Sequence, residues 1–305
     1  RCMMSPTRWI QLTVVFLLMG GCAIALAEPP QAEGAGFWRL LDNRKVGANT
    51  WLAKKPTYDG RGVVVAVLDT GVDMRRPGLL TTPDGKTKVI EARDFSGQGD
   101  VQLSPTTIEV IEGVTYLSTD EGKVSGFEKL PVQPSSPDGW QVGFLSESRF
   151  QNSDVQDINK NGQTNDRFAV ATVETDDGFV AYVDLGGDSD LSGATPIKSY
   201  SVDQKSFTFR LRDPKHQIPP VTFSLHVDID GSMVTFHYDD GGHGTHVAGI
   251  ATGHDLMGRK GYNGIAPGAQ VMSLKIGDNT LSGGSTTTDS MQRAIEFAGD
   301  WSKKN

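Results

Sequence analysis

The chain has 305 residues, of which 37% are hydrophobic and 22% charged, and it contains 36 glycines and 15 prolines. This composition is typical of a loop-rich globular protein and excludes a disordered tail, a coiled coil and a membrane protein with several spans. The formal net charge of -8 argues against a nucleic-acid partner, because phosphate backbones are bound by basic surfaces.

The first residues have the pattern of an export signal. Arg8 supplies a positive flank, residues 10–27 are mostly apolar, and Ala25-Leu26-Ala27 matches the small-x-small site that signal peptidases accept. The apolar stretch is short for a membrane span and contains two adjacent glycines. We therefore predict a signal peptide over residues 1–27, no membrane span, and a secreted or periplasmic protein.

An alternative export route uses Met19-Gly20-Gly21-Cys22, which resembles a bacterial lipobox. Cleavage before Cys22 would give a lipid anchor and a lipoprotein at the membrane surface. Cys2 and Cys22 are the only cysteines of the sequence. A chain cut after residue 27 therefore has no disulfide to stabilise it, whatever the redox state outside the cell.

The rest of the chain has the pattern of an α/β domain that is split by an insert. The uninterrupted apolar run over residues 63–68 predicts a strand buried on both faces, as in a parallel sheet covered by helices. Two pairs of short strands, at 168–183 and 221–236, flank Asp/Gly turns and predict β-hairpins. The α/β pattern then resumes, with a strand at 270–276 and an amphipathic helix over 287–300. The predicted regions are a lead-in (28–59), the first part of the domain (60–84), a mainly β insert (85–237) and the continued domain (238–305).

Asp69 and His243 are the first candidates for chemistry. Asp69 follows the buried strand, and the carboxyl ends of parallel strands are where open α/β sheets place their sites. By itself, an acidic residue at such a position more often caps the following turn. His243 is flanked by glycines at the start of a predicted helix, where the helix dipole favours the neutral, proton-accepting imidazole.

His246 allows two further interpretations. Together with His243 it has a spacing that can bring two imidazoles onto one helix face, which would suit a metal-dependent hydrolase. No HExxH-type base accompanies the pair. We therefore expect His246 to be a buried, hydrogen-bonded core histidine.

Three segments together resemble the subtilisin-like serine peptidases, the subtilase family. They are Val-Ala-Val-Leu-Asp-Thr-Gly-Val-Asp (65–73), Gly-His-Gly-Thr-His-Val-Ala-Gly (242–249) and Asn-Gly-Ile-Ala-Pro-Gly-Ala (263–269). Asp69 and His243 lie 174 positions apart, and this long insert is similar to that of the tripeptidyl-peptidase II and pyrolysin branch. The resemblance implies a subtilisin-like parallel sheet with helices on both faces, interrupted by the β insert.

The resemblance also implies acyl transfer on a peptide or protein substrate, with no required cofactor. Asp69 would orient His243, and His243 would take the proton of an attacking serine. Gly283 and Gly284 match the segment that runs beside extended substrate. No Gly-Thr-Ser-Met-Ala segment occurs, so we expect an incomplete catalytic domain, truncated before the nucleophile, and an inactive chain as given. The alternative is a catalytically inactive truncated relative that acts as a secreted binding module.

One loop has the pattern of a calcium site. Asp157, Asn159 and Asn161, followed by Gly162, match the first half of an EF-hand-like loop, which binds calcium through alternating oxygen ligands. The twelfth position is Phe168, where a bidentate Glu is expected, although Asn165 and Asp166 could substitute. Structural calcium and a metal-free polar turn are therefore both compatible with the loop.

Overall fold

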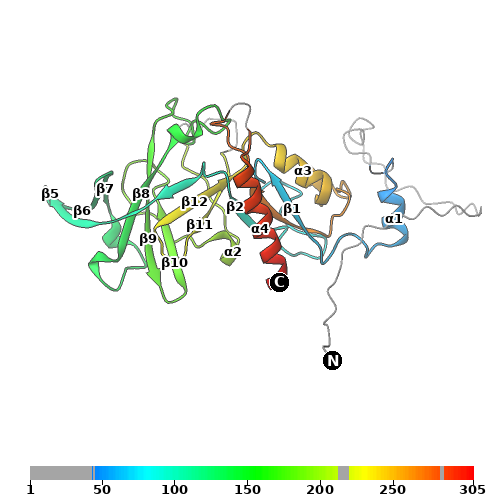
Figure 1. Ribbon diagram of the computed structural model, residues 1–305, viewed down its shortest axis with the longest axis horizontal. Coiled ribbons are helices and arrows are strands. Elements are labelled where there is room, and N and C mark those ends of the chain that lie inside the picture. The colour runs from blue at the N-terminus through cyan, green and yellow to red at the C-terminus, as the bar shows by residue number, and fades with distance from the viewer. Residues whose placement is uncertain (1–42, 44, 212–219, 282–284) are drawn as a thin grey trace, which may run out of the picture. The chain divides into compact units, whose positions relative to one another are not determined.

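A three-stranded parallel sheet contains the first strand expected from the sequence (Figure 1). The computed structural model describes residues 43, 45–211, 220–281 and 285–305. The strand order is β1-β13-β2, formed by β1 (Val64–Asp69), β13 (Gln270–Lys275) and β2 (Val89–Asp94). The last residues of these strands, Asp69, Lys275 and Asp94, are in register. Three ionisable side chains therefore end the sheet at one edge.

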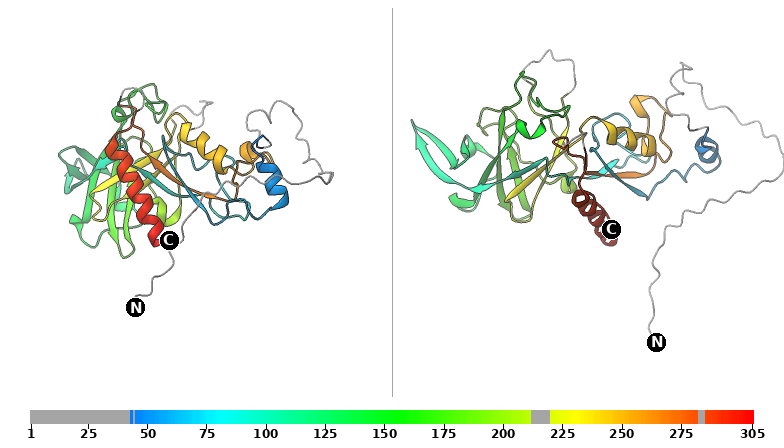
Figure 2. Two further views of the ribbon diagram at one scale, coloured as in Figure 1. Left: turned by 45° about the vertical axis from the view of Figure 1, so that its right-hand side comes forward. Right: turned by 45° about the horizontal axis from the view of Figure 1, so that its top comes forward.

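Two helices flank this sheet, α3 (His243–Thr252) and α4 (Thr288–Lys304) (Figure 2). Val65 and Val67 of β1 pack in the cluster that contains Ala248 of α3. Val64 and Leu68 instead pack in the cluster with α4. Because neighbouring residues of a strand point to opposite faces, the two helices cover opposite faces of the sheet, as expected.

The burial of β1 and α4 differs from the sequence prediction. Val67 is the one fully buried residue of β1, and Ala66 is exposed. Within the described residues, β1 pairs with β13 alone and is an edge strand of its sheet. In α4, Met291 and Ile295 of the predicted apolar stripe are 41% and 56% exposed. Within the described residues, β1 and α4 are therefore less buried than their apolar sequences predict.

Three antiparallel sheets make up the β-rich part of the chain. The first has the order β11-β12-β3, the second β10-β9-β8-β4, and the third β5-β6-β7. The strands are β3 (Asp100–Gln102), β4 (Ser104–Pro105), β5 (Thr107–Ile111), β6 (Val114–Thr119), β7 (Gly122–Ser125), β8 (Trp140–Ser146), β9 (Arg167–Thr175), β10 (Gly178–Val183), β11 (Phe223–Val227) and β12 (Met233–Tyr238). The pairs β9–β10 and β11–β12 are the two hairpins predicted from the sequence.

The β-rich part begins later than residue 85, which corrects the predicted boundary. β2 lies inside the range 85–237, yet it pairs in parallel with β13 and belongs to the sheet of β1. Its sequence, Val-Ile-Glu-Ala-Arg-Asp, alternates like a half-exposed strand, so the pattern alone cannot reveal which sheet it joins. The short helix α2 (Tyr200–Asp203) also returns to this sheet, because the Tyr200 hydroxyl donates to the Val89 carbonyl at 2.9 Å.

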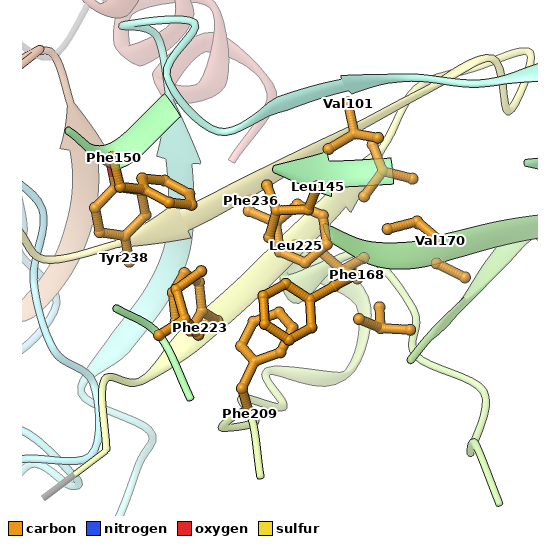
Figure 3. Packing of buried hydrophobic residues seen from close by; sticks show 14 of the residues in the cluster. Val101, Leu145, Phe150, Phe168, Val170, Phe209, Phe223, Leu225, Phe236 and Tyr238 are labelled. Atoms are coloured by element: carbon orange, nitrogen blue, oxygen red, sulfur yellow. The ribbon is translucent and has the colours of Figure 1, made fainter. Parts of the chain in front are cut away.

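An aromatic core fills the space between β8–β10 and β11–β12 (Figure 3). Phe168 and Val170 of β9 face this core, whereas Ala169 and Ala171 face a second core on the other side of the same strand. Tyr238, the last residue of β12, packs edge-on against Phe150 with ring centroids 5.0 Å apart. The strand that leads to His243 is therefore anchored in the core of the insert.

The remaining described elements are short. Helix α1 (Ala48–Lys54) has no buried residue, and single turns of 3-10 helix occur at Phe127–Lys129, Pro137–Gly139, Glu147–Phe150 and Leu256–Gly258. The predicted signal peptide, Cys22 and half of the lead-in lie outside the described residues. None of the helices in the described part of the chain is both long and apolar enough to span a membrane.

Candidate active site

Asp69 and His243 meet at the edge where β1 ends and α3 begins. His243 Nδ1 lies 2.7 Å from Asp69 Oδ1, and the Thr70 amide donates to the same oxygen at 2.8 Å. An Nδ1–H donor to a carboxylate leaves Nε2 as the proton acceptor of the neutral ring. The imidazole is 70% exposed and the Asp69 side chain 16%. The pair therefore presents a basic nitrogen from an oriented ring.

The electrostatics of His243 differ from the expectation based on the helix dipole. The hydrogen bond to Asp69, followed by the charges of Asp69 and Asp239, raises the pKa of His243 above its usual value. A nearby carboxylate favours the protonated imidazole. The carboxylates thus shift the pKa of His243 in the direction opposite to the shift that the helix N-terminus alone would cause.

Two glycines allow the two elements to approach each other. Gly71 has a φ of +113°, and a Cβ at this position would lie 2.1 Å from the Tyr238 carbonyl oxygen. A Cβ on Gly244 would lie 2.0 Å from the Gly71 carbonyl oxygen. Real Cβ atoms do not come so close to backbone oxygens. Gly244 thus allows the close approach of α3 to the β1 loop, and Gly71 allows the close approach of that loop to the end of β12.

A second carboxylate lies behind the pair. The hydroxyls of Thr70 and Thr245 both donate to Asp239, the former at 2.8 Å. The Thr70 hydroxyl in turn accepts the Gly244 amide at 3.0 Å. Burial raises the pKa of Asp239, and the two hydroxyls counteract this effect. The sequence analysis missed this residue, although it is the fourth residue before His243.

The geometry places a carboxylate and an imidazole where the sequence resemblance expects them, and the comparison with known proteins agrees. The profile of the peptidase S8 subtilase family matches residues 60–304. The chain belongs to the subtilase family.

Among known subtilases, this chain is similar to pyrolysin and to tripeptidyl-peptidase 2. Pyrolysin from Pyrococcus furiosus is 32% identical in an alignment 270 positions long, which covers 72% of this chain and 18% of pyrolysin. Tripeptidyl-peptidase 2 from Arabidopsis thaliana is 28% identical in an alignment 317 positions long, which covers 84% of this chain and 22% of that protein. A crystal structure of tripeptidyl peptidase 2 matches 82% of this chain and 23% of that chain, with a TM-score of 0.63 and 24% identity. This subtilase chain thus spans about a fifth of the length of the relatives it matches, and the structural match supports the predicted fold.

Asp240 joins the site of this subtilase to two other loops. Its amide donates to the Thr70 carbonyl at 3.2 Å, and its carboxylate accepts the Asp154 amide at 3.2 Å and the side-chain amide of Asn279. Asn279 belongs to the loop after β13. Gly283 and Gly284, the predicted substrate-binding residues in that loop, lie outside the described residues.

His246 is exposed in the subtilase chain, which contradicts its expected burial. Helix α3 buries Gly244, Ala248 and Thr252. At about 100° per residue, His246 points about 200° away from Gly244, toward solvent. Within the described residues, no group of three or more His, Cys, Asp or Glu side chains is placed to hold a metal ion. The arrangement gives no support to a metal-dependent hydrolase using His243 and His246.

The predicted calcium residues lie in a separate loop of the insert. Asp157 accepts the amides of Asn161 and Gly162 at 3.1 and 3.0 Å, and Asn159 accepts the Asn161 amide at 3.1 Å. Phe168, at the twelfth position, is fully buried in the core and offers no ligand. In the second half of the loop, the carboxylate of Asp166 accepts the side-chain amides of Asn159 and Asn161 at 2.7 and 2.5 Å. Calcium binding stays a prediction.

Proposed function

We propose that this chain is the part of an exported serine peptidase that carries the Asp and His of an Asp-His-Ser triad. The observation that carries the proposal is the 2.7 Å contact between His243 Nδ1 and Asp69 Oδ1 in a member of the subtilase family. We expect the full-length gene product to supply the serine and the oxyanion donors from the region that corresponds to the part of its relatives not spanned by this chain. The substrate would be a peptide or protein.

In the proposed reaction, His243 acts through Nε2. It accepts the proton of the serine hydroxyl as the serine oxygen attacks the peptide carbonyl carbon, and it returns that proton to the leaving amine. Water then attacks the acyl-enzyme ester with His243 as the base, which releases the acid and restores the serine. Asp69 holds Nδ1 protonated and stabilises the imidazolium that forms in each step.

A serine-directed fluorophosphonate probe tests this proposal on the full-length gene product. We expect the wild-type product to be labelled. The rate of labelling should fall by about six orders of magnitude in His243→Ala and by about four in Asp69→Asn. His246→Ala is the matched control, because it removes an exposed imidazole from the same helix and should leave labelling intact. A folded wild-type product that is not labelled contradicts the proposal, and so does equal loss in His243→Ala and His246→Ala.

Export is a separate part of the proposal. The pattern of residues 1–27 supports removal of a signal peptide, and amino-terminal sequencing of the mature protein should begin at Glu28. A mature protein that begins at Cys22 and incorporates labelled fatty acid would instead establish the lipoprotein alternative. An uncleaved chain in the cytoplasm would contradict both routes.

A further inference from the structure

We infer that Asp239 is a positioning residue for the Asp69–His243 pair, an inference that rests on the proposed function. Its carboxylate accepts hydrogen bonds from the hydroxyls of Thr70 and Thr245. Thr70 directly follows Asp69, and Thr245 is the second residue after His243. One carboxylate thus links the backbone segment that holds the acid of the pair to the helical turn that holds the base.

Both hydroxyls also accept hydrogen bonds from backbone amides. The Thr70 hydroxyl oxygen accepts the Gly244 amide at 3.0 Å, and the Thr245 hydroxyl oxygen accepts the Asp73 amide at 2.8 Å. A hydroxyl has a single proton, so donation to Asp239 orients the lone pairs that receive these amides. Without the carboxylate, both hydroxyls can rotate, and the two cross-links between the β1 loop and α3 weaken together.

Asp239 also acts on His243 by its charge. Two carboxylates affect this imidazole, Asp69 from the end of β1 and Asp239 from the end of β12, and both raise the pKa of His243. The charge of Asp73 raises the pKa of Asp239, as burial does. The carboxylate of Asp240 instead accepts hydrogen bonds from Asp154 and Asn279 in other loops. The charge of Asp239 therefore favours the imidazolium, the state that His243 must reach when it takes the serine proton.

The primary test is an NMR titration of the His243 imidazole in the 305-residue chain, with His243→Ala used for assignment. Asp239→Asn keeps the size of the side chain but removes the charge and one acceptor. We expect a lower His243 pKa in this variant and a weaker Nδ1–H resonance of the bond to Asp69. Asp240→Asn is the matched control, because it neutralises the adjacent buried carboxylate and should leave the His243 pKa unchanged.

A second pair of variants tests the hydrogen bond between Thr245 and Asp239 while the charge of Asp239 is kept. Thr245→Val lacks the hydroxyl, whereas Thr245→Ser retains it. We expect Thr245→Val to perturb the Nδ1–H resonance and Thr245→Ser to restore it. This pair keeps the inference testable if Asp239→Asn does not fold. A purely structural role for Asp239 would alter stability in all these variants but leave the titration of His243 in the folded protein unchanged.

Turnover by the full-length gene product separates this inference from the proposed function. If the product hydrolyses peptides, kcat should fall roughly tenfold to hundredfold in Asp239→Asn, as for a misplacement of about 1 Å, with KM within about twofold. If no variant hydrolyses peptides but the His243 pKa still falls in Asp239→Asn, the positioning role holds and the proposed function fails. An active enzyme whose His243 pKa and kcat are both unchanged in Asp239→Asn overturns the inference.

Discussion

The close approach of α3 to the β1 loop can be tested with one substitution made at two sites. Gly244→Ala adds a methyl group at the start of α3, where it meets the Gly71 carbonyl oxygen. Gly299→Ala adds the same group within α4, where, among the described residues, nothing lies within 4 Å of it apart from its chain neighbours and the backbone of its own helix. The two variants share a helical backbone and differ in what the new Cβ contacts.

The expected magnitudes follow from these contacts. The Cβ of Gly244→Ala would lie 2.0 Å from the Gly71 oxygen, whereas such a contact needs about 3.3 Å. Helix α3 must therefore move by about 1.3 Å, against packing that costs about 3 kcal/mol to deform. Alanine recovers about 1 kcal/mol of helix propensity. The free energy of unfolding should fall by about 2 kcal/mol in Gly244→Ala and rise by about 1 kcal/mol in Gly299→Ala.

Chemical denaturation of the 305-residue chain measures both changes. The shift of α3 should also stretch the 2.7 Å contact between His243 and Asp69, and the His243 pKa in Gly244→Ala should then fall toward its usual value because the main cause of its increase is that bond. If Gly244→Ala is as stable as Gly299→Ala and its His243 pKa is unchanged, the close-approach argument is refuted.

Three further predictions concern other parts of the chain. Burial lowers the pKa of His226 and of His237 from 6.5 to about 3. Because the folded state binds fewer protons than the unfolded state between these pH values, the free energy of unfolding should fall as pH decreases from about 6.5 toward 3. His237→Gln should flatten this pH dependence of the free energy of unfolding, as measured by urea denaturation. Thr287 caps α4 by accepting the Ser290 amide at 3.0 Å, so Thr287→Ala should cost about 1 kcal/mol while Thr287→Ser costs less, as thermal unfolding can show. Calcium should raise the melting temperature in the wild type but not in Asp157→Ala; no change in the wild type would contradict the predicted calcium site.

Local patterns were sufficient to predict the parts of the site that depend on one short segment. The apolar run before Asp69 marks the end of a strand, and the glycines around His243 mark a close approach at the start of a helix. The two hairpins were also predictable, because strands and turn residues lie within about 20 positions of each other.

Features that depend on distant contacts were not predictable in this way. The hydroxyl of Thr70 reaches Asp239 across 169 positions, and no periodicity reports such a bond. β2 joins the parallel sheet through pairing with β13, which its alternating sequence does not encode. The orientation of His246 follows from which face of α3 is buried, and spacing to His243 alone does not determine that face.

The anchoring of β12 in the core of the insert has a consequence for biosynthesis. Asp69 leaves the ribosome 174 residues before His243, which at about 5–20 residues per second corresponds to roughly 10–30 s. In the folded chain, the strand that precedes the imidazole pairs with β11, and its last residue, Tyr238, packs against Phe150. The growing polypeptide therefore has no assembled acid–base pair until the intervening sheets and His243 have been synthesised.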